Sequence, residues 1–136
     1  MKKFLKFLLV LVIILIIGLV IFFNLPKSNI KKKDAAFAMK SHIIYQAFNK
    51  NEAAANKKYL GKVFEIEGKI LDKAIDRRDA GVVRLSQSKK SQVMITLSND
   101  QTTKLENYDV GDMIKVKAKC NGYIQEVVFD KGIIVE

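Results

Sequence analysis

The residues of this sequence best suited to chemistry are basic side chains near its middle and one later tyrosine. Together they could cradle an anion and stack on a planar group: Arg77, Arg78, Arg84, Lys89, Lys90 and Tyr123. Guanidinium and ammonium groups bind phosphates, and an aromatic ring gives a nucleic-acid base a surface to stack on. Asp72, Asp76 and Asp79 dilute the positive charge, so a solvated loop is the competing interpretation.

No catalytic, cofactor or metal pattern accompanies these cations. The chain has one histidine, His42, and one cysteine, Cys120, which are too few ligands for a transition-metal site. Cys120 shares the alternation of Ile114 and Val116, which predicts a buried, unreactive thiol. Since the sequence also lacks a Gly-rich phosphate loop and a nucleophile elbow, we predict no enzyme, no cofactor and no metal.

A second basic feature is the alternation of Lys115, Lys117 and Lys119, which resembles a track for a polyanion. Glu65 and Glu67 alternate in the same way on an earlier predicted strand. Opposite charges paired across neighbouring strands stabilise a sheet by about 0.2–1 kcal/mol each. We therefore favour a structural role for these lysines.

The elements that must position these residues are strands, because polar and apolar residues alternate from Lys62 onward. The predicted strands cover residues 62–70, 82–86, 93–98, 113–120 and 127–135. Gly68 predicts a bulge or sharp bend in the first strand. The longest gap, 99–112, has room for a helical turn around Lys104 to Tyr108. This order predicts a mainly β fold, a five-stranded OB-fold Greek-key barrel.

An OB-fold usually binds ligands on its second and third strands, beside the loops that follow strands one and four. Those loops are predicted at residues 72–80 and 121–125, and they carry Arg77, Arg78 and Tyr123. The outward positions of the two strands carry no aromatic residue, so we do not expect nucleic-acid binding. The whole chain has 24 Lys and Arg against 14 Asp and Glu, but seven lysines precede residue 34, which leaves a net charge of only +3 after it.

Short amphipathic helices are predicted before the barrel, over residues 34–60. Asp34 is the expected cap of the first helix, whose apolar stripe includes Phe37, Ile44 and Phe48. Asn51 is the expected cap of a second helix that ends at Gly61. Both helices are expected to pack onto the barrel.

The N-terminus predicts a transmembrane helix, because an unbroken apolar run extends from Phe7 to Phe23. A cleaved signal peptide is the alternative, but the run is long and no small-residue cleavage motif follows it. We expect an anchor over residues 1–25, a basic solvated linker over 26–33 and the OB domain over 34–136. The short basic N-terminus favours a cytoplasmic start, with the domain outside the cytoplasmic membrane.

The barrel sequence resembles the bacterial tRNA_anti-like family. The likeness lies in Asn51-x3-Ala55-x3-Tyr59-x-Gly61-Lys62-Val63-x-Glu65-x2-Gly68-x-Ile70, then Val110-Gly111-Asp112-x-Ile114-x-Val116 and Cys120-Asn-Gly122. The resemblance implies an OB-fold that is often exported or membrane-anchored, with no common activity and no catalytic residues to carry over. Ala118 stands where the family often has glycine, and Gly132 where many members have a second cysteine.

These observations predict a membrane-anchored OB-fold binding module that holds a ligand or partner protein near the membrane. Two alternatives remain, a structural subunit of an envelope complex and an oligonucleotide-binding OB domain. The transmembrane run lacks a small-xxx-small motif of the kind that packs against other membrane helices.

Overall fold

The computed structural model describes residues 1–23, 29–86, 88 and 90–135. Its first element is α1 (Lys2–Phe23), whose large apolar side chains from Phe7 to Phe23 are exposed. By length and composition the stretch Lys6–Phe23 is able to cross a membrane, and a signal sequence near an N-terminus has the same character. Part of the expected linker, residues 24–28, lies outside the described residues.

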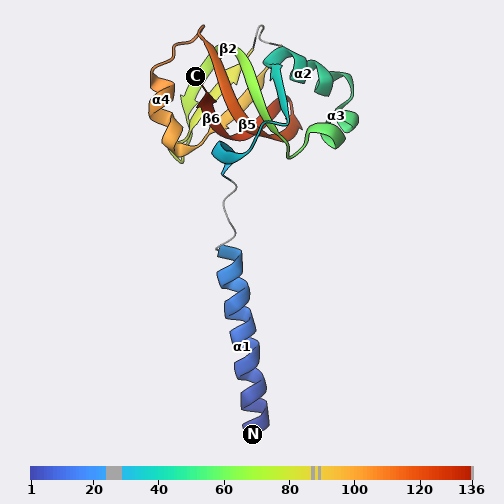
Figure 1. Ribbon diagram of the computed structural model, residues 1–136, viewed down its shortest axis with the longest axis vertical. Helices are drawn as coiled ribbons and strands as arrows, with labels where there is room; N and C mark the ends of the chain where they lie inside the picture. Colours follow the sequence, from blue (N-terminus) through green and yellow to red (C-terminus); the bar gives the residue numbers. More distant parts are fainter. Residues whose placement is uncertain (24–28, 87, 89, 136) are drawn as a thin grey trace.

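Five strands close into a barrel (Figure 1). They are β2 (Val63–Ile75), β3 (Gly81–Leu85), β4 (Val93–Leu97), β5 (Met113–Ile124) and β6 (Glu126–Val135). The strand order is β2-β3-β4-β6-β5, and β5 returns to pair with β2. All neighbours are antiparallel except β4 and β6, which are parallel. This arrangement confirms the predicted OB-fold.

The long strand β2 takes part in both halves of the barrel. Residues 63–69 pair with β5, and residues 70–75 pair with β3, with a register shift between Ile70 and Asp72. The irregularity therefore lies just beyond Gly68. Gly68 instead lets the side chains of Ser41 and Leu85 pack close to the backbone of β2. A Cβ at this position would lie 2.6 Å from the Oγ of Ser41 and 3.0 Å from the Cβ of Leu85.

The segment before the barrel differs from the prediction at its start. Residues Phe37–Lys40 form a short strand, β1, that pairs in parallel with residues 64–67 of β2, so the expected helix cap at Asp34 is wrong. The physical reason is packing, since the Phe37 ring stacks on Phe64 at a centroid distance of 4.9 Å. The helices that follow are α2 (Ser41–Lys50) and α3 (Glu52–Tyr59). The Asn51 cap is confirmed, because its Oδ1 accepts a hydrogen bond from the Ala54 N–H at 3.0 Å.

Helices cover both ends of the barrel (Figure 1). Ile44 and Phe48 of α2 are 0% and 1% exposed and join the barrel core at one end. At the other end, a 3-10 turn η2 (Asn99–Gln101) leads into α4 (Thr102–Glu106), where Leu105 is buried. The predicted helical turn in the 99–112 gap is thus confirmed, although it starts and ends slightly earlier.

The second part of the expected linker packs on the barrel. A 3-10 turn, η1 (Ile30–Lys32), buries Ile30 to 3% exposure against β5 and β6. Lys31 forms an ion pair with Asp100, and the ammonium of Lys117 donates to the carbonyl of Lys33 at 3.0 Å. Residues 29–33 are therefore part of the folded domain rather than solvated chain.

Candidate functional site

The outer surface of β3 and β4 is the face by which OB-folds usually bind ligands. Its half-buried outward side chains are Val82, Arg84, Met94 and Thr96. No aromatic side chain lies among them. The next strand, β6, adds Glu126, Val128 and Asp130 to the same outer surface. This face therefore has carboxylates as well as the single arginine.

Arg84 is already neutralised by the barrel itself. Its Nη1 lies 3.2 Å from Oδ2 of Asp72 on β2, and its Nε lies 3.4 Å from Oε2 of Glu126 on β6. Its Nη2 contacts the sulfur of Met94 at 3.8 Å. The side chain is only 33% exposed. An incoming phosphate would have to compete with two carboxylates for this guanidinium, so Arg84 acts as a cross-strand clamp.

The loop of Arg77 and Arg78 is shorter than predicted, because β2 continues through Ile75. Asp76 organises this loop by accepting hydrogen bonds from the backbone N–H groups of Arg78, at 2.8 Å, and Ala80, at 3.0 Å. The backbone bond from Ala80, followed by that from Arg78, lowers the pKa of Asp76. Arg78 is 84% exposed and its Nε lies 3.6 Å from Oδ2 of Asp76, and Arg77 is also exposed.

The predicted cations that the structure describes do not come together. Arg77 and Arg78 precede β3, while Lys90 is exposed in the loop that follows it. A five-residue strand separates these two loops by roughly 17 Å. Lys89 lies outside the described residues. The described cations therefore form no single cradle for an anion, and a ligand role for these side chains stays a prediction.

Tyr123 lies in β5 rather than in a loop, because β5 and β6 are joined by Gln125 alone, which has a φ of 70°. One face of the Tyr123 ring stacks on Phe48 of α2, with centroids 6.2 Å apart and planes 14° apart. Tyr45 packs against the same ring at 6.4 Å. Desolvation, followed by the neighbouring Tyr45, raises the pKa of Tyr123. The ring is thus engaged in holding α2 on the barrel.

The lysine stripe of β5 faces the predicted glutamates. Glu65 lies directly opposite Lys117, and Glu67 lies opposite Lys115. The predicted register is confirmed, although no ion pair joins these charges within the part of the chain that the structure describes. Lys117 instead holds the backbone of Lys33.

Cys120 is 0% exposed, as its alternation predicted, and desolvation raises the pKa of its thiol. His42 is half-buried on α2, with no hydrogen-bond partner at Nδ1 in the structure as described. Neither residue lies in a cluster of metal ligands among the described residues. The two residues thus have the character of packing groups.

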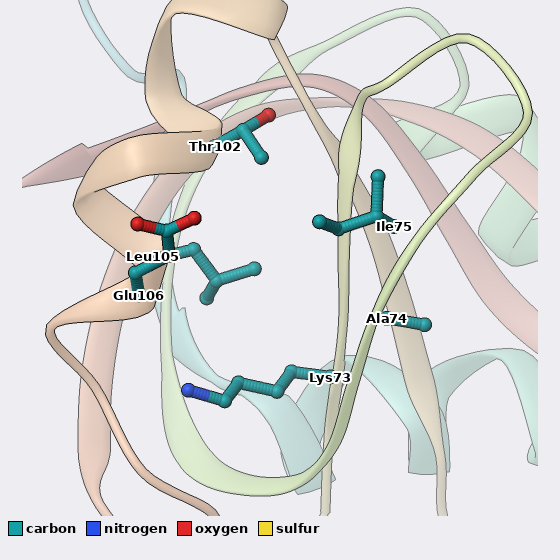
Figure 2. A pocket seen from close by; sticks show the side chains of 6 residues that line it. All are labelled: Lys73, Ala74, Ile75, Thr102, Leu105 and Glu106. Carbon is teal, nitrogen blue, oxygen red and sulfur yellow. The ribbon is translucent and has the colours of Figure 1, made fainter.

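An apolar cleft that sequence reasoning missed lies between the end of β2 and α4. It has a volume of about 180 Å³ and is lined by Lys73, Ala74, Ile75, Thr102, Leu105 and Glu106. Figure 2 shows Ile75 and Leu105 facing each other across the cleft, with Lys73 extending along one side. Lys73 donates to the carbonyl of Tyr108 and lies 3.9 Å from Asp109. An apolar cavity of about 150 Å³ holds a benzene-sized group, so this cleft fits one large apolar side chain.

The strand beside the cleft has an unpaired edge. Residues 72–75 of β2 pair with β3 on one side, and no strand among the described residues pairs with their other side. Asp76 N–H donates to Ala80 O across the β2–β3 ladder. Because such bonds alternate along antiparallel strands, the backbone groups of Lys73 and Ile75 point away from β3. The cleft and this edge together form a surface suited to an extended peptide.

A family model and one solved structure agree with the fold. A family model described as tRNA_anti-like matches residues 1–133. A lipoprotein from Klebsiella pneumoniae subsp. pneumoniae, described as a candidate nucleic acid-binding protein, is 16% identical with a TM-score of 0.61, over 72% of this chain and 91% of that one. The Stn1–Ten1 complex of S. pombe is 14% identical with a TM-score of 0.44, over 54% of this chain and 58% of that one. No curated protein sequence matches the chain.

Proposed function

Because the chain belongs to the tRNA_anti-like family of OB-fold proteins, we propose that it is a membrane-anchored binding module whose barrel holds a partner protein beside the membrane. The observation that carries this proposal is the apolar cleft between β2 and α4 beside an unpaired strand edge. A sheet edge supplies backbone hydrogen bonds to an added strand, and a neighbouring pocket selects one of its side chains. The ligand is then an extended segment of a protein with one large apolar residue.

The exposure of Ile75 supports this position for the partner. Ile75 is 59% exposed although it borders an apolar cleft, and an added strand would cover it. Exposed apolar surface beside an open strand edge is otherwise an aggregation liability that proteins cover or avoid. A bound partner segment removes both liabilities at once.

Nucleic acid is the second candidate ligand, because the K. pneumoniae neighbour is described as a candidate nucleic acid-binding protein. The ligand face of this barrel is poorly suited to that role. Arg84 is paired with Asp72 and Glu126, and Tyr123 is packed under α2. Single-strand binding relies on open aromatic platforms and unpaired cations, which this face does not offer among its described residues.

The anchor in this proposal is α1, with the barrel outside the cytoplasmic membrane. Its exposed apolar side chains have the length and composition to span the bilayer. The K. pneumoniae neighbour is a lipoprotein, which agrees with a place in the cell envelope. We assign the protein a binding role rather than a catalytic one, since the cleft is lined mainly by apolar groups.

Site-specific photocrosslinking tests the proposed function. A benzoylphenylalanine placed at Ile75 in the full chain, in its own membranes, should yield one nuclease-resistant protein adduct. The matched control is Leu60 on the far side of the barrel, which is 53% exposed and should yield none. Adding Glu106→Arg, which brings a longer side chain of opposite charge to the exposed edge of the cleft, should abolish the adduct.

Equal adducts from both positions, or an adduct that survives Glu106→Arg, would contradict binding at the cleft. A nuclease-sensitive adduct would favour nucleic acid. One fixed stoichiometric partner in every preparation would identify the protein as a structural subunit of a larger complex.

A further inference from the structure

We infer that the surface around η1 is a membrane-contact surface that binds anionic phospholipid headgroups and holds the barrel against the bilayer. We call it the η1 surface and define it by five lysines, Lys31, Lys32, Lys33, Lys117 and Lys131. This inference rests on the membrane anchor of the proposed function. It adds that the surface next to the anchor binds lipid.

Chain length places the η1 surface near the headgroups. α1 ends at Phe23, and Asn29, the cap of η1, already packs on the domain. The six residue steps between them span at most roughly 20 Å when fully extended. If α1 crosses the hydrocarbon core, η1 stays within roughly 20 Å of the end of α1 and is able to reach the lipid headgroups.

The lysines of η1 are fixed in place because η1 is docked on the barrel. Ile30 is 3% exposed, and the Asn29 side chain accepts a hydrogen bond from the Lys31 N–H at 3.2 Å. The Lys33 N–H donates to Ile30 O at 3.1 Å, and Lys33 O accepts from Lys117. In Figure 1, η1 lies beneath β5 and β6 at the side of the barrel where the chain enters. Binding of lipid to these lysines therefore orients the whole barrel.

The charge of the η1 surface complements an anionic bilayer. Three carboxylates lie beside these lysines: Asp100, which pairs with Lys31 at 2.6 Å, Asp34 next to Lys33, and Glu65 opposite Lys117. Lys32 and Lys33 are exposed. Positive charges held close to a bilayer attract anionic headgroups, and the attraction falls off within a Debye length.

A cleft beside η1 offers a place for one headgroup. It has a volume of about 400 Å³ and is lined by Asn29, Ile30, Lys31, Ser98, Asp100, Lys131 and Ile133. Hydrogen-bond donors at its border come from two lysines and two neutral polar side chains, but Lys31 also pairs with the carboxylate of Asp100, so a phosphate here shares Lys31 with that carboxylate. The apolar Ile30 and Ile133 suit the glycerol end of a lipid.

Energy transfer between the barrel and the bilayer tests this inference. The full chain is placed in nanodiscs of phosphatidylcholine, with or without phosphatidylglycerol, that carry a headgroup acceptor dye. A donor dye is attached at Asn107→Cys, which is exposed, while the native Cys120 is buried. We expect transfer efficiency to rise when phosphatidylglycerol is present and to return to the phosphatidylcholine value in high salt.

Two double variants test whether lipid binds at the η1 surface in particular or to any exposed lysines of the domain. Lys32→Gln with Lys33→Gln should abolish the rise. Lys57→Gln with Lys58→Gln removes two other exposed lysines, on α3, and should leave the rise unchanged. Equal transfer in both lipid mixtures, or equal loss in both variants, would overturn the lipid contact. Loss of the protein from membranes on alkaline extraction would instead overturn the anchor itself.

Discussion

Truncation of Phe48 tests whether α2 closes one end of the barrel. Phe48 is 1% exposed, and its ring centroid lies 6.2 Å from those of Tyr59 and Tyr123. Replacing a buried Phe by Ala costs about 3–5 kcal/mol. A domain of this size has a total stability of about 5–15 kcal/mol, so Phe48→Ala should still fold but open much more often. Since about 1.4 kcal/mol changes an equilibrium constant tenfold, the population of opened molecules should rise roughly 100- to 4,000-fold.

Thiol labelling of Cys120 measures this opening in the full chain in detergent. Cys120 is the sole cysteine and is 0% exposed, and burial raises its pKa, so it reacts only when the domain opens. When reclosing is faster than labelling, the labelling rate follows the open population. Phe48→Ala should therefore be labelled faster by the factor given above, whereas the native protein should resist the reagent until it is denatured.

Two further variants make the result decisive. Ile43 is 45% exposed on the same helix, so Ile43→Ala should change stability by only about 0.5 kcal/mol. Phe48→Leu keeps most of the volume and should cost less than about 1.5 kcal/mol. If Phe48→Ala accelerates labelling less than tenfold, or no more than Ile43→Ala does, α2 does not close the barrel. Fast labelling of the native protein would place Cys120 at the surface.

Three other outcomes are expected. Gly68→Ala should destabilise the domain by about 1–3 kcal/mol, less so in a Ser41→Gly background, because the new Cβ would lie 2.6 Å from the Ser41 Oγ; denaturation of the single and double variants checks this. Folding lowers the pKa of Asp76 below its ordinary 3.8, so the ionised carboxylate stabilises the folded state fully above pH 3.8, and this stabilisation is lost as the pH falls through the lower folded pKa. Thermal melts of Asp76→Asn should lack this part of the loss of stability in acid. Mass spectrometry of protein extracted from membranes should find peptides that begin at or near Met1, and a mature N-terminus within residues 24–33 would exclude a retained anchor.

The barrel could be predicted from sequence because one face of each strand is buried. Phe64 and Ile66 are 0% exposed while Glu65 and Glu67 are only half-buried, and the same alternation marks the other strands. β1 could not be predicted in this way. Phe37 has helical spacing to Ile44 and Phe48, and the choice of strand depends on pairing with β2, which is distant in sequence. Tertiary contacts override local patterns most readily in short segments.

The candidate site was harder to predict because its contacts are non-local. Arg84 meets Asp72 and Glu126 only when three strands come together. The basic residues on either side of β3 are close in sequence, but the strand between them carries them to opposite ends of the barrel. Predicting the cleft would have required knowing that β2 continues to Ile75, beyond its clearly alternating residues. It would also have required knowing that α4 packs beside this end of the strand. Its signal in the sequence is weak: a single isoleucine, Ile75, beyond the alternating run of the first predicted strand.

Titration of labelled single-stranded DNA and RNA tests most directly whether this OB domain binds protein rather than nucleic acid. Nucleic-acid affinity falls with salt by a log–log slope of roughly −0.7 per phosphate contact. With Arg84 held by Asp72 and Glu126, the full chain in nanodiscs should show no sub-micromolar binding at physiological salt. Sub-micromolar binding that weakens steeply with salt, and that is lost when Arg77, Arg78 and Arg84 are changed to Ala, would contradict the proposed function.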